Sequence, residues 1–529
     1  MKRYTSGTKR LTLLLIKQYR WKLVLWLAGF FFVTIVTASS YPRVFLTKED
    51  LYHFGLTVKN PAMIALLGPG YPLEAYTYGT VFANEMLLIT AVIVAVMNIL
   101  LASQATRRDE EQGTLEIVLS LPIGRLAYTF AAIILLCVTN LLLWVSIGIG
   151  LGLQSIEGYT WNAAFLYGGL LASNGLLFGV LTLLIGQLSS TARGTTAISF
   201  AVLIIFYILR AVGDVKIKWL SFLSPLGWIG QAYVFYENQW WPIALTLLIS
   251  IMVLCVAIIL NQARDLYAGF LPTLKGRAQA SPLLQTPFGL LLRLNGLFIL
   301  SFLVILFLFG LATGAILSDF EFYFKDLPVF DELLGEATFD SVIAFLNMLF
   351  SYINVIPALI VMFHLWSEER HNRTEVLYST TWSKGLWLGS HYLMAVVVSV
   401  FMQLTLAISL WITGRTALPE NYTIGTFLMS ALVYLPAMWV LIGLAALFIG
   451  LWPKGSSVVW LYLTFCFVID YIGELAGVPD IIQSLSLYYH TPFVPEEAIK
   501  WQILSLFSVF SVTFFLIGFF HYLRRDIKG

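Results

Sequence analysis

Long apolar runs alternate with short polar connections along almost the whole chain of 529 residues. Each run holds about 20 residues, which is the length of helix that crosses the hydrocarbon core of a bilayer. The pattern predicts twelve membrane-spanning helices, at 22–40, 80–103, 126–152, 161–187, 194–212, 241–261, 291–316, 340–364, 388–413, 423–450, 456–473 and 501–524. We therefore expect an all-α polytopic membrane protein.

The composition agrees with this fold class, because 59% of the residues are hydrophobic and only 11% are charged. Such a balance excludes an ordinary soluble domain. The three cysteines, Cys137, Cys255 and Cys466, all fall inside predicted spans, a placement that fits neither a disulfide framework nor a zinc site. We expect no metal site, no cofactor bound to this chain and no nucleic-acid partner.

The distribution of Lys and Arg predicts the orientation. If both termini lie in the cytoplasm, the cytoplasmic parts of the chain hold 22 of the 31 Lys and Arg residues. Such an excess is typical of the cytoplasmic side of a membrane protein. A basic amphipathic leader at 1–21 contributes to it, and the acidic 317–340 loop lies outside in this arrangement.

A charged segment interrupts the apolar pattern between the second and third predicted spans. This first charged segment, RRDEEQGTLEIVLSLPIGR, covers 107–125. A second charged segment at 366–384 aligns with it, without gaps, 259 residues later. The alignment pairs residues of similar chemistry: Asp109 with Glu368, Glu110 with Glu369, Glu116 with Glu375, Ser120 with Ser379 and Arg125 with Lys384.

Good helix formers fill the first charged segment up to Pro122, so the sequence predicts a short helix there. Leu115, Val118 and Leu119 share one face by their three-and-four spacing. We expect the helix to present an apolar ridge, flanked by carboxylates, to a protein partner, with Gly113 allowing a second backbone to approach closely. A helix lying on lipid headgroups is the alternative, but such helices favour Lys and Arg on the polar face.

Further features recur in the same order, which predicts two parallel six-span halves. Two aromatic-rich segments that contain Pro or Gly, 219–241 and 481–501, each precede the last span of a half. We call them the first and second broken segments. The halves are expected at 1–262 and 291–529, joined by a cytoplasmic linker at 263–290.

The first charged segment resembles the first cytoplasmic loop of type-2 ABC exporter permeases. An acidic pair, a Gly-Thr-Leu-Glu core and a Leu-Pro-x-x-Arg ending carry the resemblance, and in that family they form the coupling helix. The order of leader, six-span unit, charged segment and broken segment extends it over the whole chain. A fused pair of such halves is similar to the bacterial permeases that export polyketide and polyether-ionophore antibiotics, including the tetronasin- and narasin-resistance type.

The second charged segment departs from the family pattern. Asn372 and Arg373 stand where the first segment has Gly113 and Thr114, and the proline is replaced by Thr381. The two segments are therefore expected to bind a common partner with different strengths.

The resemblance implies that each charged segment docks on one of two copies of a cytoplasmic ABC ATPase subunit, which binds ATP and magnesium. This chain has no Gly-x-x-x-x-Gly-Lys-Ser/Thr phosphate loop, so we expect no enzymatic activity of its own. The implied cargo is a hydrophobic compound, above all an antibiotic, moved out across the bacterial plasma membrane. The residues implied to contact the ATPase are Glu110, Glu111, Gly113, Thr114, Glu116, Arg125, Glu368, Glu369, Arg370, Glu375 and Lys384.

Residues near the outer ends of the predicted spans are candidates for the substrate path. Glu85 and Asp470 lie inside predicted spans, where an acid either pairs with a polar neighbour or marks a transport route. Aromatic residues of the broken segments form either a lid on that route or an interfacial belt. The aromatic candidates are Phe222, Trp228, Tyr233, Tyr488 and Tyr489.

Two other functions are compatible with twelve spans. A secondary drug or lipid transporter would need polar groups near the middle of the membrane, and we expect few there. A membrane-embedded transferase would need converging catalytic side chains, and none converge in the sequence. His364, His371 and His391 lack converging carboxylates for a metal site. Neither alternative explains the paired charged segments.

Overall fold

The computed structural model describes residues 6–124, 126–154, 156–271, 279–317, 338–370, 372–379, 382–415, 422–472 and 478–526. Within these residues every regular element is a helix, which confirms the all-α membrane fold. The chain divides into two compact units, Met1–Lys275 and Gly276–Gly529, which are described one at a time. That the two units are copies of one repeat stays a prediction.

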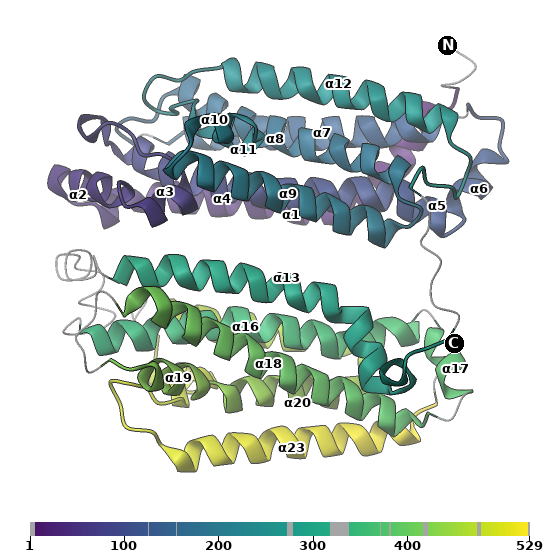
Figure 1. Ribbon diagram of the computed structural model, residues 1–529, viewed down its shortest axis with the longest axis vertical. Coiled ribbons are helices and arrows are strands. Elements are labelled where there is room, and N and C mark those ends of the chain that lie inside the picture. Colours follow the sequence, from purple (N-terminus) through teal and green to yellow (C-terminus); the bar gives the residue numbers. More distant parts are fainter. Residues whose placement is uncertain are drawn as a thin grey trace. The chain divides into compact units, whose positions relative to one another are not determined.

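Six long helices form unit 1 (Figure 1): α1 (Thr8–Val44), α4 (Tyr78–Ser103), α7 (Ala127–Gly152), α8 (Trp161–Leu188), α9 (Ala192–Val215) and α12 (Trp241–Ala263). The central helix is α8, which packs against α4, α7, α9 and α12. Small residues allow this close packing. A Cβ on Gly168 of α8, for example, would lie 2.8 Å from the carbonyl oxygen of Trp144 in α7.

Short helices lie at the two ends of unit 1 (Figure 1). One end carries α2 (Lys48–Val58), α3 (Pro61–Leu67), η1 (Leu73–Ala75), α10 (Lys218–Phe222) and α11 (Pro225–Gly230). The other end, which we call the charged-segment end, carries η2 (Gln104–Arg108), α5 (Asp109–Glu111) and α6 (Thr114–Leu119). The first charged segment and the first broken segment therefore lie at opposite ends of the unit.

The long helices of unit 2 are α13 (Pro287–Ile316), α16 (Phe339–Arg370), α18 (Lys384–Gly414), α20 (Leu435–Leu451), α21 (Val458–Ile472) and α23 (Trp501–Arg524). Its shorter helices are η3 (Pro282–Gln285), α17 (Arg373–Tyr378), α19 (Ile424–Leu432), η5 (Pro453–Gly455), α22 (Asp480–Gln483) and η6 (Tyr488–His490). α18 packs against α13 and α16, and α20 packs against α23. The buried apolar core lies among α16, α18 and α20.

Among the described residues, eleven helices are long and apolar enough to cross a membrane, and they correspond to eleven of the predicted spans. The span predicted at 456–473 is α21, which has 15 residues. A helix of that length rises about 22 Å, less than the roughly 30 Å of a bilayer core. A twelfth span therefore stays a prediction.

The leader and the first predicted span form one continuous helix, α1, of 37 residues. The leader within this helix has a buried face of its own. Leu11, Leu15 and Tyr19 pack into an apolar cluster with the adjoining ends of α4 and α7. The basic leader is thereby attached to the charged-segment end of unit 1.

Candidate functional site

The first charged segment folds as two short helices around a turn. α4 continues through the π turn η2 into α5, and α6 follows after Gly113. Gly113 has φ 75°, in the left-handed region that glycine adopts without steric cost. The prediction of one continuous helix is therefore wrong. Gly113 thus serves the turn, and the nearest atom of this chain to a Cβ there would be the Tyr267 hydroxyl oxygen at 4.0 Å. The close approach of a partner's backbone at Gly113 stays a prediction.

Two arginines hold Glu110 inside unit 1. Both of its carboxylate oxygens accept hydrogen bonds from Arg264, at 2.8 and 2.7 Å, and Arg107 lies 3.0 Å away. All three side chains are buried. A bidentate arginine–carboxylate pair is strong where little water competes for it. The carboxylate predicted to contact a partner therefore fixes α5 to the end of α12.

A strap of residues 264–271 follows α12 and crosses the first charged segment. The amide nitrogen of Tyr267 donates to Glu110 at 2.7 Å, its hydroxyl donates to Glu116 at 3.0 Å, and its carbonyl accepts from Arg107 at 3.2 Å. The bond to Glu116 raises the pKa of the Tyr267 hydroxyl, which keeps it a neutral donor. These bonds maintain φ 63° at Tyr267, a strained value for that residue. The strap ends on α8, where two of its amide nitrogens donate to backbone carbonyls.

The other acids of the segment join it to three more helices. Asp109 accepts from the hydroxyls of Tyr19 in α1, at 3.4 Å, and Tyr128 in α7, at 2.5 Å. Glu111 accepts from the amide nitrogen of Ala192, at 2.9 Å. Because the first amide groups of a helix have no partner within it, this bond caps α9. The acid-rich sequence thus serves attachment within the unit.

The apolar ridge was expected to face the surface, and this prediction is wrong. Leu115 and Val118 instead pack inward against the buried cluster of α1, α4 and α7. The apolar side chain of α6 that points outward is Ile117, 72% exposed, beside the exposed Glu116. Thr114, at the start of α6, is half-buried. Two predicted positions lie outside the described residues: the side chain of Leu119 and the whole of Arg125.

The second charged segment makes a similar turn between two helices. α16 ends at Arg370, Asn372 adopts φ 56°, and α17 follows. Asparagine is one of the few residues other than glycine that adopt the left-handed region readily, so Asn372 replaces Gly113 without changing the turn. In both segments the amide nitrogen of this residue donates to the carbonyl three residues earlier, at 3.1 and 2.9 Å.

Glu369 of the second segment is buried and pairs with Arg525. Arg525 follows α23, the last long helix of unit 2, as Arg264 follows α12 in unit 1. The carbonyl of Arg525 also accepts from the Lys384 ammonium at 3.1 Å. One oxygen of Glu369 has no hydrogen-bond partner in the described part of the chain. The two ion pairs are therefore similarly placed but unequally completed.

The other acids and arginines of the second segment lie near its surface. Glu368 accepts from Arg373 at 3.0 Å, and its carboxylate lies 3.4 Å from the His364 imidazole. Val376 is 69% exposed and occupies the position in α17 that Ile117 occupies in α6. Two further predicted residues are exposed on the same segment: Arg370 and Glu375.

Sequence reasoning missed Arg264, Arg525 and the strap residue Tyr267. A signal was present, since each arginine directly follows the last apolar run of its half. That position is chemically suited to an attachment, because it places a cation at the charged-segment end of the unit.

The two acids within predicted spans are paired with polar neighbours. Glu85 in α4 accepts from the Tyr41 hydroxyl of α1 at 2.5 Å. Asp470 in α21 accepts from the hydroxyls of Tyr352 in α16 and Ser486, the latter at 2.5 Å. This geometry favours the pairing interpretation over a free carboxylate on a transport route.

The first broken segment contains a strained aromatic turn after α11. Tyr233 and Phe235 have φ 42° and 65°, which are unusual for aromatic residues. The Tyr233 carbonyl accepts three backbone amide nitrogens at 3.0–3.1 Å. The rings are also held: Tyr233 packs edge-on against Tyr71, and Phe235 lies 4.8 Å, centroid to centroid, from Tyr159.

The other aromatic candidates divide into buried and exposed side chains. Trp228 is buried and its indole nitrogen donates to the Phe222 carbonyl at 2.7 Å, whereas the Phe222 ring is exposed. Tyr488 is buried and stacks on Tyr352 with centroids 4.1 Å apart. Tyr489 is exposed. Each broken segment thus has an anchored aromatic residue and an exposed one.

The interiors of both units are more polar than the sequence predicts. Asn98 and Asn140 bond each other twice in unit 1, at 3.1 and 2.7 Å. In unit 2 Asn354 donates to Gln403 at 2.9 Å. All four amides are buried within long helices, so the expectation of few polar groups in the middle of the spans is wrong. Mutual hydrogen bonding offsets the cost of placing them there.

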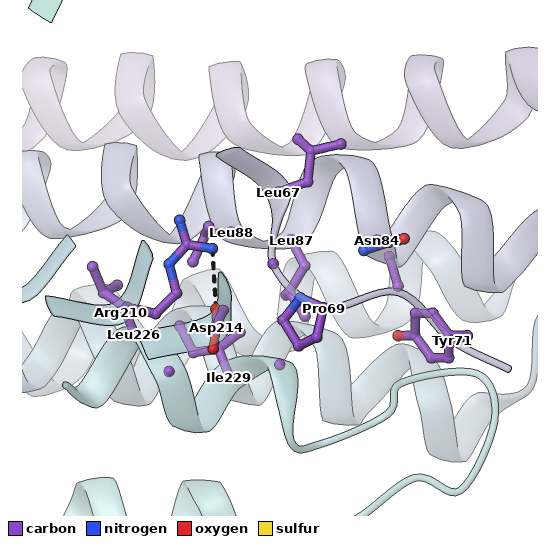
Figure 2. A pocket seen from close by; sticks show the side chains of 14 residues that line it. Leu67, Pro69, Tyr71, Asn84, Leu87, Leu88, Arg210, Asp214, Leu226 and Ile229 are labelled. Carbon is purple, nitrogen blue, oxygen red and sulfur yellow. Dashed lines mark hydrogen bonds and ion pairs between the residues drawn. The ribbon is translucent and has the colours of Figure 1, made fainter. Parts of the chain in front are cut away.

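A buried ion pair that the sequence analysis did not single out lies near the other end of unit 1 (Figure 2). Arg210 of α9 lies 3.4 Å from Asp214, whose other oxygen accepts from the Ser221 hydroxyl at 2.6 Å. The guanidinium also donates to carbonyls at the end of α3, one of them that of Ala65 at 2.5 Å. These bonds join α3, α9 and α10 beside a small cavity.

Comparisons with known proteins agree over most of the chain. A family model described as "Multidrug efflux system permease Rv1217c, C-terminal domain" matches residues 11–260 and 284–523. A Mycobacterium tuberculosis protein described as multidrug efflux system permease protein Rv1217c is 30% identical over 477 residues. The match covers 89% of this chain and 85% of that protein. The matched ranges include both charged and both broken segments, and neither description mentions ionophores.

Proposed function

Because the chain belongs to the family of Rv1217c-like multidrug efflux permeases, we propose that it is the membrane subunit of an ATP-driven exporter. The observation that supports this most directly is the pair of charged segments. Each has the same left-handed turn, the same buried glutamate–arginine attachment and one exposed apolar residue at its tip. Two similar charged segments suit two copies of one partner.

The partner we propose is a cytoplasmic ABC ATPase, one copy on each charged segment. The tip of α6 offers Ile117 beside Glu116, and the tip of α17 offers Val376 beside Glu375. A complementary groove would be apolar with a basic rim, since opposite charges at the edge of an interface guide association and fix its register. ATP and magnesium would bind to the partner.

In this proposal the charged-segment end of each unit faces the cytoplasm of a bacterium, with both termini inside and the broken segments outside. The ion pairs then have a mechanical role. A force applied at α6 reaches α12 through Glu110 and Arg264, and a force at α17 reaches α23 through Glu369 and Arg525. Each charged segment is thus joined both to the helix before it and to the last helix of its unit.

The cargo we propose is a lipophilic drug, with polyketide and polyether-ionophore antibiotics as the first class to test. A strongly charged cargo would need charged partners within the spans. In the described spans, the acids Glu85 and Asp470 are instead occupied by hydroxyl groups, and Arg210 is paired with Asp214. Cells with the exporter should therefore tolerate lipophilic antibiotics better than cells without it.

The decisive experiment is to co-express the chain with the ATPase encoded beside it and to purify the complex. We expect two ATPase subunits per chain, and drug-stimulated ATP hydrolysis that the chain alone lacks. Transport in reconstituted vesicles should require ATP and persist when the proton gradient is collapsed. Transport that needs the gradient and no ATPase would instead identify a secondary transporter and overturn the proposal.

A further inference from the structure

The leader part of α1 has two unlike faces. Leu11, Leu15 and Tyr19 pack into the buried cluster of unit 1. On the opposite side four cations are exposed to the surroundings of the unit, and three apolar side chains beside them are 51–69% exposed. We call this side the basic face. Its members are Lys9, Arg10, Lys17 and Arg20, with Leu13, Leu14 and Trp21.

The positive charge of the basic face is not neutralised by the chain around it. Among the residues that the structure describes, no ion pair includes any of its four cations. The sequence has no Asp or Glu before Glu49. Arg20 lies instead over the Trp21 ring, 5.5 Å from its centroid. A surface with this excess of one charge attracts an anionic partner.

The length of α1 places the basic face at the edge of the membrane. Its 37 residues rise about 55 Å, whereas a bilayer core is roughly 30 Å thick. The uncharged stretch that can fill this core begins at Leu23, directly after Lys22. Lys17 and Arg20 lie within about 10 Å of its start. Their long side chains can therefore reach the level of the lipid headgroups.

An exposed apolar row continues the basic face along the span. Its members are seven or four residues apart, which places them on one side of a helix. They are Leu14, Trp21, Leu25 and Phe32, each at least 51% exposed. The basic face and the lipid-facing side of α1 thus form one surface. A phospholipid fits both parts of it, since its acyl chains can contact the row while its headgroup meets the cations. A soluble protein could not follow the row into the membrane.

The first long helix of unit 2 has the apolar row without the cations. In α13 the side chains of Leu297 and Leu300 are 64% and 57% exposed. The only Lys or Arg of this helix is Arg293. Both helices can therefore contact acyl chains, but only α1 presents a group of cations to the headgroups. The two helices provide a comparison within one chain.

We propose that the basic face of α1 binds the headgroup of an anionic phospholipid, with Lys17 and Arg20 at the phosphate. Lys9 and Arg10 add attraction from farther along the helix. Each Lys or Arg close to an anionic membrane surface strengthens binding about fivefold. The bound lipid would also hold the leader against the first charged segment, because Tyr19 on its buried side bonds Asp109. The lipid site does not rest on the proposed export function.

The test uses the purified full chain in phosphatidylcholine nanodiscs and two photoactivatable lipids. Both lipids carry the same diazirine in one acyl chain, and their headgroups are phosphatidylglycerol and phosphatidylcholine. Mass spectrometry identifies the labelled peptides. We expect phosphatidylglycerol to label 21–36 of α1 at least fivefold more than phosphatidylcholine does, whereas α13 should be labelled equally by both. Unlabelled phosphatidylglycerol should compete for α1, and soluble glycerol 3-phosphate should not.

Paired substitutions test the assigned residues. Lys17→Gln with Arg20→Gln should reduce the preference of α1 for phosphatidylglycerol to less than twofold. Lys17→Arg with Arg20→Lys keeps the charge and should keep the preference. The matched control is Lys216→Gln with Lys218→Gln, which removes two exposed cations from the opposite end of unit 1. It should leave the preference unchanged, and the labelling of α13 in every variant reports whether the chain is intact.

Equal labelling of α1 by the two lipids would overturn the proposal, and so would a preference that survives Lys17→Gln with Arg20→Gln. An equal loss in the control pair would trace the preference to net charge alone, with the same consequence. If the glutamine pair weakens an ATPase complex but leaves lipid labelling unchanged, the basic face binds that partner and no lipid. The expected labelling in a chain that forms no ATPase complex would leave the lipid site standing while the proposed export function fails.

Discussion

The two charged segments share a left-handed turn but differ in how firmly they are attached. Each turns on a left-handed residue, and each buries a glutamate against the arginine that follows the last long helix of its unit. Glu110 also lies close to the Arg107 guanidinium and accepts a hydrogen bond from the Tyr267 amide of the strap. At the position of Arg107 the second segment has Trp366, and one oxygen of Glu369 lacks a partner among the described residues.

The difference shows that the turn and its attachment are separable. Gly113 in the first segment and Asn372 in the second make the same turn, because glycine and asparagine both tolerate a positive φ. Arg264 bonds both oxygens of Glu110, whereas Arg525 bonds one oxygen of Glu369 and leaves the other without a partner among the described residues. An unbonded buried acceptor costs about 1–3 kcal/mol. We therefore expect the first charged segment to move rigidly with α12. The second charged segment should deform more before its motion reaches α23.

Removing the arginine that pairs with the buried glutamate of each charged segment should have the largest effect. Arg264→Met leaves the buried Glu110 with one cation fewer, and we expect a loss of about 3–5 kcal/mol in local stability of the first segment. Arg525→Met should cost about 1–3 kcal/mol, because the pair in unit 2 is already incomplete. Hydrogen exchange of 107–121 and 366–379 measures both. Equal losses would show that the two attachments are energetically alike.

Placing a charge on the apolar tips should have the next largest effect, on partner binding alone. Ile117→Asp and Val376→Asp should each weaken ATPase association by about 2 kcal/mol, the size of an interface hot spot. Folding should be unchanged because both side chains are mostly exposed. Pull-down at matched expression is the measurement, with Leu153→Asp as an exposed control away from the charged segment. A loss in only one variant would mean that only one segment docks.

Substitutions at the turn compare the two backbones directly. Gly113→Val and Asn372→Val should each cost about 1–2 kcal/mol, because a β-branched residue is forced into the left-handed region. Gly113→Asn and Asn372→Gly should be nearly neutral. Thermal unfolding of the purified chain checks all four. A large loss with Gly113→Asn would mean that the glycine has a role beyond its φ.

The smallest effect is expected at the strap. Tyr267→Phe removes the hydroxyl bonded to Glu116 and should speed amide exchange in α6 roughly two- to fivefold. The bond raises the pKa of this hydroxyl, so its contribution is complete below the ordinary tyrosine value of about 10 and is lost as the pH rises through the raised value. Tyr236→Phe, at another exposed tyrosine of unit 1, is the control. Unchanged amide exchange in α6 would indicate that the backbone hydrogen bonds of the strap hold α6 without the Tyr267 hydroxyl.

The sequence predicted the helical architecture well, because twenty-residue apolar runs have few alternatives in a chain of this composition. The alignment of the charged segments also anticipated equivalent residues, since Glu110 and Glu369 are both buried and both paired with arginine. The place of Arg264 and Arg525 after the last apolar run of each half indicates a cation there, but not the acid that each one pairs with. Arg264 is more than 150 residues from Glu110, and a single sequence carries no sign of which distant charges meet.

The orientation of α6 could not be predicted for a different reason. Helical spacing shows which residues share a face, but not what that face packs against. Leu115 and Val118 do share one, and it faces the unit because it packs against the buried cluster that α1, α4 and α7 form at this end. That cluster joins distant parts of the chain, so helical spacing within the segment does not indicate it.

The aromatic turn of the first broken segment has a consequence for how readily that region opens. Two aromatic residues in the left-handed region store about 2–4 kcal/mol together, and the ring contacts of Tyr233 with Tyr71 and of Phe235 with Tyr159 must outweigh this energy. Without the ring contacts, only the hydrogen bonds of the turn would oppose this strain. A compound that separates the rings would let the backbone relax, so the energy already stored there would drive part of the opening.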